Sequence, residues 1–197
     1  MNDVARYWEQ QAPSFDDAPD HGLRDPAIRE AWASLLIGLM PAAPARVADL
    51  GCGTGSLAVL LAEAGYDVSG LDVAAGMVTR ARAKAAAAGV QADFAIGDAM
   101  TPPWPQGSFD VVLARHVLWA LPDPGVGLSH WFELLNPEGR LVLVEGRWWT
   151  GAGLSAQALL SLMDATGREA SIVALDDPAL WGGPVSDERY LLTSPPR

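Results

Sequence analysis

The sequence has one cysteine, few basic side chains and no long apolar run. Because Cys52 is the only cysteine among the 197 residues, no intramolecular disulfide can form, which suits a reducing compartment. Lysine and arginine total 13 against 24 aspartate and glutamate residues, so the formal net charge is −11. Nucleic-acid binding depends on clusters of basic side chains. The charge therefore argues against a nucleic-acid partner.

Further absences exclude several kinds of site. No apolar run reaches the roughly 18 residues of a membrane helix, and no basic-then-apolar signal peptide opens the chain. We therefore expect a cytoplasmic protein without a membrane partner. The three histidines, His21, His116 and His130, are dispersed, and no Cys-x-x-Cys or His-Glu-x-x-His pattern occurs, so we expect no metal site. The absence of Gly-x-Ser-x-Gly argues against a serine nucleophile of the hydrolase type.

The chain is organised around a glycine-rich stretch. Residues 46–55 read Arg-Val-Ala-Asp-Leu-Gly-Cys-Gly-Thr-Gly, and an Ala/Leu-rich segment follows. This order predicts a strand, a glycine turn and the start of a helix. Glycine has no Cβ to block a ligand and tolerates positive φ, and the first turn of a helix has free N–H groups. The stretch therefore predicts a binding site for a small ligand.

The remaining chain alternates predicted strands with predicted helices. Strands are expected at 46–50, 66–71, 92–96, 109–114, 140–145, 170–175 and 189–192, and helices at 26–39, 56–64, 74–87, 124–135 and 154–165. This alternation, with nearly continuous apolar strands, predicts a parallel, doubly wound α/β sheet in a single domain. Residues 1–24 are polar and rich in turn-forming residues, and a turn is expected around 181–184.

Four segments carry a resemblance to a known family. Asp49-Leu-Gly-Cys-Gly-Thr-Gly55 resembles the first motif, acid-x-Gly-x-Gly-x-Gly, of the class I S-adenosylmethionine-dependent methyltransferases. The second, third and fourth motifs are similar to Gly70-Leu-Asp-Val73, Gly97-Asp-Ala-Met100 and the segment 109–119. The resemblance covers about residues 26–193.

The resemblance implies a fold, a cofactor and a reaction. The fold is a Rossmann-like, mostly parallel seven-stranded sheet that ends in an antiparallel hairpin. The whole chain, 1–197, would be one methyltransferase domain, in which residues 1–25 form a cover and 26–193 the core. S-adenosylmethionine would donate a methyl group to a small molecule through an O, N, S or C nucleophile, and S-adenosylhomocysteine would leave.

The first two motifs imply contacts to the methionine part and the ribose of the cofactor. Asp49 would lie near the cationic methionine part, over the turn formed by Gly51, Cys52, Gly53 and Gly55. Asp72, followed by Val73, would accept hydrogen bonds from the ribose hydroxyls, as a carboxylate after the second strand can do. The alternative is an aspartate that caps the next helix. Met77 would pack on the adenine or belong to the core.

The last two motifs imply adenine contacts and a general base. Asp98 would accept from the adenine amino group, Ala99 would donate its N–H to the ring, and Met100 completes the motif. Arg115 would bind the cofactor or form a structural ion pair. His116 is the best-placed general base, because a neutral imidazole takes a proton near pH 7; the alternative is a histidine that only lines the site.

Some residues outside the motifs complete the prediction. Tyr7 and His21 could reach the ligands from the cover, and His130 is predicted to be structural. Four tryptophans near strand ends or in the cover suggest an aromatic or apolar acceptor pocket, although tryptophan is more often a core residue. They are Trp8, Trp119, Trp148 and Trp149.

Two rival functions stay open. A nicotinamide-dependent oxidoreductase would carry Gly-x-Gly-x-x-Gly, but Ser56 occupies the place of its last glycine. A module that binds S-adenosylmethionine without catalysis has the same motifs. The sequence does not predict the oligomeric state.

Overall fold

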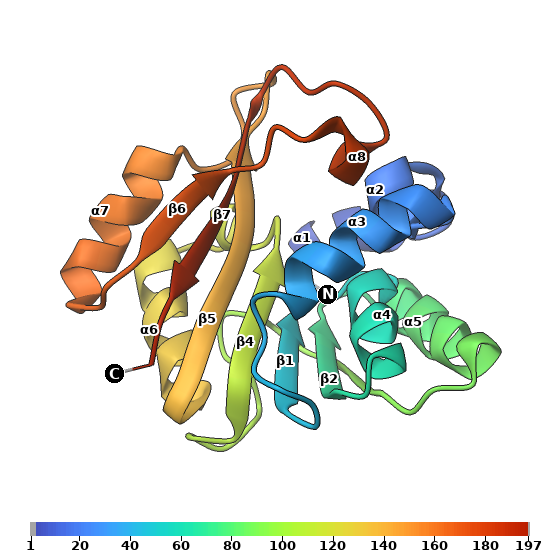
Figure 1. Cartoon of the computed structure of the whole chain (residues 1–197), viewed down its shortest axis with the longest axis horizontal. Helices are drawn as coiled ribbons and strands as arrows, with labels where there is room; N and C mark the ends of the chain where they lie inside the picture. The colour runs from blue at the N-terminus through green and yellow to red at the C-terminus, as the bar shows by residue number, and fades with distance from the viewer. Residues whose placement is uncertain (1–2, 197) are drawn as a thin grey trace.

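A computed structural model describes residues 3–196, and its centre is a seven-stranded sheet in the order β3-β2-β1-β4-β5-β7-β6 (Figure 1). The strands are β1 (Arg46–Leu50), β2 (Asp67–Asp72), β3 (Asp93–Ile96), β4 (Phe109–Arg115), β5 (Leu135–Arg147), β6 (Ser171–Ala174) and β7 (Glu188–Ser194). Strands β1 to β5 pair in parallel, and β7 runs antiparallel to both β5 and β6. The predicted fold class is confirmed.

Helices cover both faces of the sheet. One layer contains α3 (Pro26–Ile37), α4 (Ser56–Glu63), α5 (Ala75–Ala88) and α8 (Pro178–Trp181); the other contains α6 (Pro124–Leu134) and α7 (Ala156–Thr166). Neighbouring strand residues alternate between the layers, since Val111 packs with the first and Val112 with the second. Because both faces are buried, the strands are apolar throughout, which explains why the pattern in the sequence located them.

The order of the strands determines where a ligand-binding crevice can form. The chain passes from β1 outward to β2 and β3, then returns to β4 on the other side of β1. Ligands of open α/β sheets bind at such a reversal, outside the carboxyl ends of the strands. In Figure 1 these ends point toward the top of the molecule.

Most predicted elements lie within two residues of the observed ones. Asp25 caps α3 as expected, because its Oδ1 accepts the Ala27 N–H at 2.8 Å and Pro26 occupies the first helical position. Gly89 ends α5 with φ of +69°.

Two expectations of local structure differ from the structure. The amino-terminal segment contains the helix α1 (Asp3–Gln11), the 3₁₀ turn η1 (Phe15–Asp17) and the short helix α2 (Pro19–Gly22). The expected turn around 181–184 is present at Gly182, directly after the additional helix α8, whereas β5 begins at Leu135 rather than at residue 140, with a register shift opposite Phe109. In the amino-terminal segment, packing against distant residues outweighs a polar local sequence: α1 buries Ala5, and Ala12 just beyond it packs on Met77.

None of the helices within residues 3–196 combines the length and the apolar character that crossing a bilayer requires.

Candidate functional site

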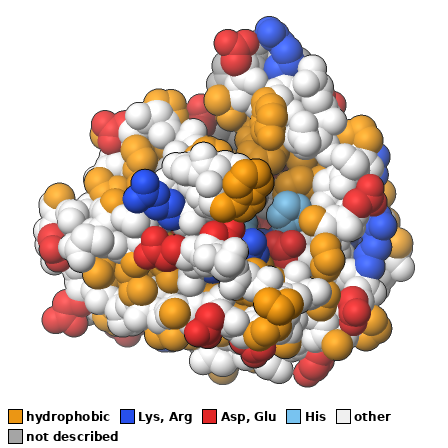
Figure 2. All heavy atoms as spheres, turned by 90° about the horizontal axis from the view of Figure 1, so that it is seen from above, with side chains coloured by type: hydrophobic (Ala, Val, Ile, Leu, Met, Phe, Trp, Pro, Cys, Tyr) orange, Lys and Arg blue, Asp and Glu red, His pale blue; other side chains and the backbone are white. Residues whose placement is uncertain are grey.

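A cavity of about 420 Å³ opens at the carboxyl edge of the sheet. Its volume lies within the roughly 300–1,000 Å³ of small-molecule sites. Figure 2 looks down on this edge and shows a hollow with hydrophobic side chains around it and charged and histidine side chains deep inside. The predicted site residues that line it are Asp49, Gly51, Cys52, Gly53, Asp72, Val73, Met77, Asp98, Ala99, Arg115 and His116. The topology has therefore brought together residues from four strand ends.

Two predicted site residues lie outside the lining of this cavity. Gly55 starts α4 with φ of +76°, and a Cβ there would meet the Ala81 Cβ at 2.8 Å, so it permits α4 to approach α5. Met100 donates its N–H to Asp98 Oδ1 at 2.8 Å, and its carbonyl oxygen lies 2.7 Å from His130 Nδ1. His130 thus has the structural place predicted for it.

The glycine turn is enclosed from two sides. Gly51 and Gly53 have φ of +66° and +54°, a conformation that favours glycine. A Cβ on Gly51 would lie 2.4 Å from Val117 Cγ2, and one on Gly53 would lie 3.2 Å from the Phe15 ring. A side chain at Gly51 would clash with Val117, and one at Gly53 would require both a strained backbone and a shift of the Phe15 ring. Cys52 is buried in the same turn, and burial raises the pKa of its thiol, so it stays protonated and unreactive.

Asp72 ties this turn to the end of β2. Its Oδ2 accepts the Gly53 N–H and its Oδ1 accepts the Ala74 N–H, both at 2.9 Å. Burial raises the pKa of Asp72, while these N–H groups act in the opposite direction. Asp72 therefore holds the turn that leads into α5 but does not cap that helix, because the N-cap residue is Ala74 and no side chain caps it. A carboxylate has about four acceptor positions, so room for donors from the cavity is left.

Asp49 is a buried acid without a partner for one oxygen. The residue is 3 % exposed, and Oδ2 has no hydrogen-bond partner within the described part of the chain. Burial raises the pKa of Asp49 to about 7, although the charge of Arg115 opposes this shift. A buried, unsatisfied acceptor is costly. The cavity thus offers a position that suits a cation or a hydrogen-bond donor.

The end of β4 supplies Arg115 and His116. Arg115 lies over the Trp32 ring, 5.0 Å from its centroid, and donates from Nη1 to the Asp20 carbonyl at 2.6 Å. Its guanidinium thus holds α2 in place. His116 has φ of +60° and lies between two tryptophan rings, Trp148 at 5.1 Å and Trp181 at 6.0 Å.

The His116 imidazole is neutral and has an unused nitrogen. Burial lowers its pKa well below the usual value, and the charge of Arg115 acts in the same direction. Nε2 is buried and has no partner among the described residues. Because His116 lines the cavity, this neutral ring is a candidate hydrogen-bond acceptor for a ligand there.

The amino-terminal segment covers the cavity and is tied down by polar contacts. Tyr7, Trp8, Phe15 and His21 line the cavity from α1, η1 and α2. Glu9 Oε2 accepts the Gly76 N–H at 2.9 Å. With the Arg115 contact to α2, this bond attaches the segment at two well-separated points.

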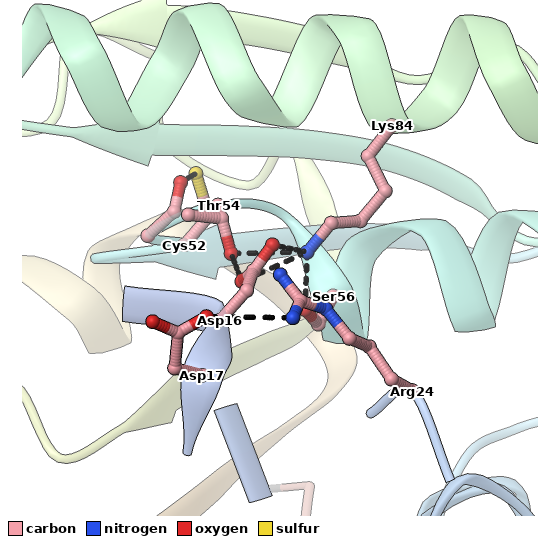
Figure 3. Close-up of polar contacts among 8 residues, drawn as sticks. Asp16, Asp17, Arg24, Cys52, Thr54, Ser56 and Lys84 are labelled. Atoms are coloured by element: carbon pink, nitrogen blue, oxygen red, sulfur yellow. Dashed lines mark hydrogen bonds and ion pairs between the residues drawn. The ribbon is translucent and has the colours of Figure 1, made fainter. Parts of the chain in front are cut away.

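Figure 3 shows a third attachment, centred on Asp16. Its carboxylate accepts the Thr54 hydroxyl and lies 3.0 Å from Lys84 Nζ. Lys84 also donates to Ser56 Oγ at 2.6 Å and Thr54 Oγ1 at 3.0 Å. Thr54 and Ser56 are almost fully buried. The cluster therefore links η1 to the glycine turn and to α5.

The wall opposite the acids is aromatic. Trp119 and Trp148 both line the cavity, with ring centroids 5.3 Å apart, and Leu121 and Pro122 lie beside them. The prediction for Trp149 is wrong, because its side chain is 87 % exposed and does not line the cavity. Consecutive residues in the segment after β5 point in different directions, which a sequence pattern cannot resolve.

Within residues 3–196, no three His, Cys, Asp or Glu side chains are placed to hold a metal ion.

Comparison with known proteins finds similarity to methyltransferases. A methyltransferase domain matches residues 48–143, which contain the glycine turn and reach from within β1 into β5. A demethylmenaquinone methyltransferase of Thermus thermophilus is 40% identical over 105 residues, covering 52% of this chain and 48% of the relative. Residues 48–143 thus match a methyltransferase domain, and the chain is similar to S-adenosylmethionine-dependent methyltransferases.

Other similar proteins show the range of this methyltransferase fold. A ubiquinone biosynthesis O-methyltransferase of Azorhizobium caulinodans is 37% identical over 147 residues, covering 71% of this chain and 56% of the relative. The chain thus spans about half the length of the curated relatives it matches. The crystal structure of the 4+2 cyclase SpnF superposes with a TM-score of 0.74 at 22% identity, covering 84% of this chain and 80% of that one.

The structure adds residues that the sequence patterns did not indicate. Glu145, Phe15 and Asp16 contact the turns around the cavity. An acid at the end of an apolar strand is a signal that could have identified Glu145. No local pattern could have identified Asp16, because its partners are 38 and 68 positions away.

The buried carboxyl of Asp49 predicts a pH-dependent stability. Because burial raises its pKa to about 7, the ligand-free native state holds a proton that the unfolded state releases near pH 4. Stability therefore falls as pH rises through this window, by up to about 1.4 kcal/mol per pH unit. Asp49→Asn removes this contribution. Urea unfolding of both proteins should show the variant gaining relative stability between pH 4 and 7; a constant difference would contradict the assignment.

Proposed function

We propose that this chain transfers the methyl group of S-adenosylmethionine to a small, uncharged aromatic molecule. One observation carries the proposal: a single cavity has acids and bare backbone on one side and aromatic rings on the other. The first side suits the cationic, hydroxyl-rich cofactor, and the second suits an apolar acceptor.

The residues present fit the cofactor. Asp49 offers a buried, unpartnered oxygen to a cationic group, and Asp72 keeps acceptor positions for ribose hydroxyls. Asp98 lines the cavity with Oδ2 outside its bond to Met100, so it can accept from an adenine amino group. When bound, the cofactor supplies an electrophilic methyl group on a sulfonium.

The chain's own contribution is positioning, exclusion of water and acceptance of a proton. The cover and the rings of Trp119 and Trp148 would hold the acceptor against the cofactor in a dry site. His116 Nε2 is neutral and unpartnered, so it can take the proton of an acceptor hydroxyl. An acceptor that reacts through a deprotonated atom would not need this step.

The acceptor is uncharged because the aromatic side of the cavity offers no free charge to pair with it. Among the described residues that line the aromatic side, Arg115 is the one cation, and its guanidinium donates to the Asp20 carbonyl. Two similar proteins are named a demethylmenaquinone methyltransferase and a ubiquinone biosynthesis O-methyltransferase, and these names support an acceptor of the quinone type.

We also infer the roles of the segments and the setting. Residues 1–25 would act as a cover on the core at 26–193, within one methyltransferase domain; residues 1 and 2 lie outside the described part. A cytoplasmic location and a small-molecule rather than nucleic-acid partner are expected from the single cysteine and the net charge of −11.

Cofactor binding can be measured by calorimetry with S-adenosylhomocysteine. We expect the parent protein to bind it and Asp72→Asn to bind at least about tenfold more weakly, because hydrogen bonds to charged groups contribute about 1.5–3 kcal/mol. The matched control is Asp177→Asn, which retains a capping oxygen at the start of α8, away from the cavity. Equal affinity of Asp72→Asn and the parent for S-adenosylhomocysteine would contradict the proposed role of Asp72 in binding the ribose.

Transfer itself requires a panel of phenols, naphthols and aliphatic alcohols with labelled S-adenosylmethionine. The expected result is turnover of aromatic acceptors and, in His116→Asn, a loss of about 10²–10⁴ in kcat for hydroxyl acceptors, with no matching loss of cofactor affinity. Asparagine suits the positive φ of this position. Unchanged kcat in His116→Asn would contradict its role as a base.

The same measurements separate the rivals. Uptake of reduced nicotinamide, seen as a change in its absorbance, would favour an oxidoreductase. Binding of S-adenosylhomocysteine without transfer to any acceptor would favour a non-catalytic module. The similarity to a cyclase shows that the fold alone does not decide the chemistry.

The cover can be tested through product release. Asp16→Ala removes the carboxylate that Thr54 and Lys84 contact, so S-adenosylhomocysteine should dissociate roughly tenfold faster. The neighbouring Asp17→Ala is the control, because its contact to Arg24 is exposed and worth little. Stopped-flow fluorescence gives the dissociation rate of S-adenosylhomocysteine from each variant. Identical rates in the two variants would show that Asp16 does not hold the cover closed.

A further inference from the structure

Glu145 is a buried acid near the end of β5 that the proposed reaction does not use. The residue is 0 % exposed and does not line the cavity. Its Oε1 accepts two backbone N–H groups, from Val117 at 2.9 Å and from Leu118 at 2.7 Å. One side chain thus satisfies two donors of the turn that follows β4.

That turn forms part of the aromatic wall. His116, at its start, donates its N–H to the Val144 carbonyl, next to Glu145 on β5. Val117 packs directly on Gly51, and the Trp119 indole donates to the His116 carbonyl at 2.9 Å. The turn therefore carries the imidazole and one tryptophan of the wall, and it lies against the glycine turn.

Water cannot replace the acceptor that Glu145 provides to the Leu118 N–H. Leu118 is 0 % exposed, so water is not available to its N–H group. A buried N–H group that loses its acceptor is left without a hydrogen bond, which destabilises the protein by the full desolvation free energy of that group. Glu145 also lies opposite Tyr190 on β7, whose hydroxyl is engaged with the Leu154 carbonyl.

We propose that Glu145 is a positioning residue for the methyl acceptor: through its two backbone contacts it fixes the turn that presents His116 and Trp119. This inference rests on the proposed function for the role of that wall, but the hold on the turn stands on the structure. Glu145 acts from behind the wall and touches neither ligand.

The Glu145 carboxyl can be replaced by two side chains of similar length, one with an acceptor oxygen and one without. Burial raises the pKa of Glu145 to about 8, against the effect of the N–H donors, so near neutral pH the carboxyl is largely protonated. Glutamine reproduces this form, with one carbonyl oxygen for the two N–H groups. Methionine has a similar length and no such acceptor.

Hydrogen exchange of the full chain tests the hold on the turn. In Glu145→Met, the amides of Val117 and Leu118 should exchange at least about tenfold faster than in the parent, since an acceptor is lost. In Glu145→Gln they should exchange at the parent rate. The amide of Val112 in the core of β4 reports whether each variant is folded. Glu145→Asp, whose shorter side chain falls out of reach, gives a second test should the methionine variant not fold.

Ligand binding tests the positioning. With S-adenosylhomocysteine saturating, fluorescence titration with 2-naphthol should give an affinity about tenfold weaker in Glu145→Met than in Glu145→Gln. Calorimetry should show a smaller change for S-adenosylhomocysteine. A merely structural role would weaken both ligands alike.

Two results would overturn the proposal. One is unchanged exchange of Val117 and Leu118 in Glu145→Met and Glu145→Asp; the other is equal weakening of both ligands. A parent protein that binds S-adenosylhomocysteine but not 2-naphthol would instead count against the aromatic acceptor, while the exchange rates would still decide whether Glu145 fixes the turn.

Discussion

The hydrogen bond from the Gly53 N–H to the Asp72 carboxylate is the contact on which the rest of the site depends. It joins the turn after β1 to the end of β2 and fixes the backbone between them. Val117 and Phe15 then pack on Gly51 and Gly53, where a side chain would clash or strain the backbone. The aromatic wall and the cover are therefore both placed relative to one short piece of bare backbone.

Three of the five buried side-chain atoms without a partner among the described residues lie at the carboxyl edge of the sheet; the other two, Arg140 Nε and Ser194 Oγ, lie toward its opposite end. Asp49, His116 and Glu145 each keep a buried side-chain atom without a partner in the described part of the chain. Such atoms cost stability, and each of these residues comes from the end of a different parallel strand or directly after it. Proteins accept local conflicts of this kind where function requires them, so the edge is specialised for binding rather than for stability.

An element could be predicted from the sequence where local patterns determine it, and could not where contacts between residues far apart in the sequence hold it in place. Strand positions and sheet class could be predicted because burial on both faces leaves continuous apolar runs, and the acids at strand ends marked the cofactor side. The fold of residues 3–25 could not, because α1 and η1 are held by contacts such as Glu9 to Gly76 and Asp16 to Lys84. Trp148 and Trp149 differ only in the local path of the backbone, which places one in the cavity and exposes the other.

His116, with its left-handed backbone at the end of β4, belongs to a fixed part of the site, whereas the side chains around it form a part that can vary. Its N–H still completes the ladder to Val144, and its positive φ turns the chain away immediately afterwards. The imidazole is therefore mounted on the rigid tip of a central strand, without an intervening loop. Side chains that surround it come instead from the cover and from the segment after β5. Divergence toward new acceptors can proceed by exchanging those surrounding side chains, while the proton-accepting group keeps its place.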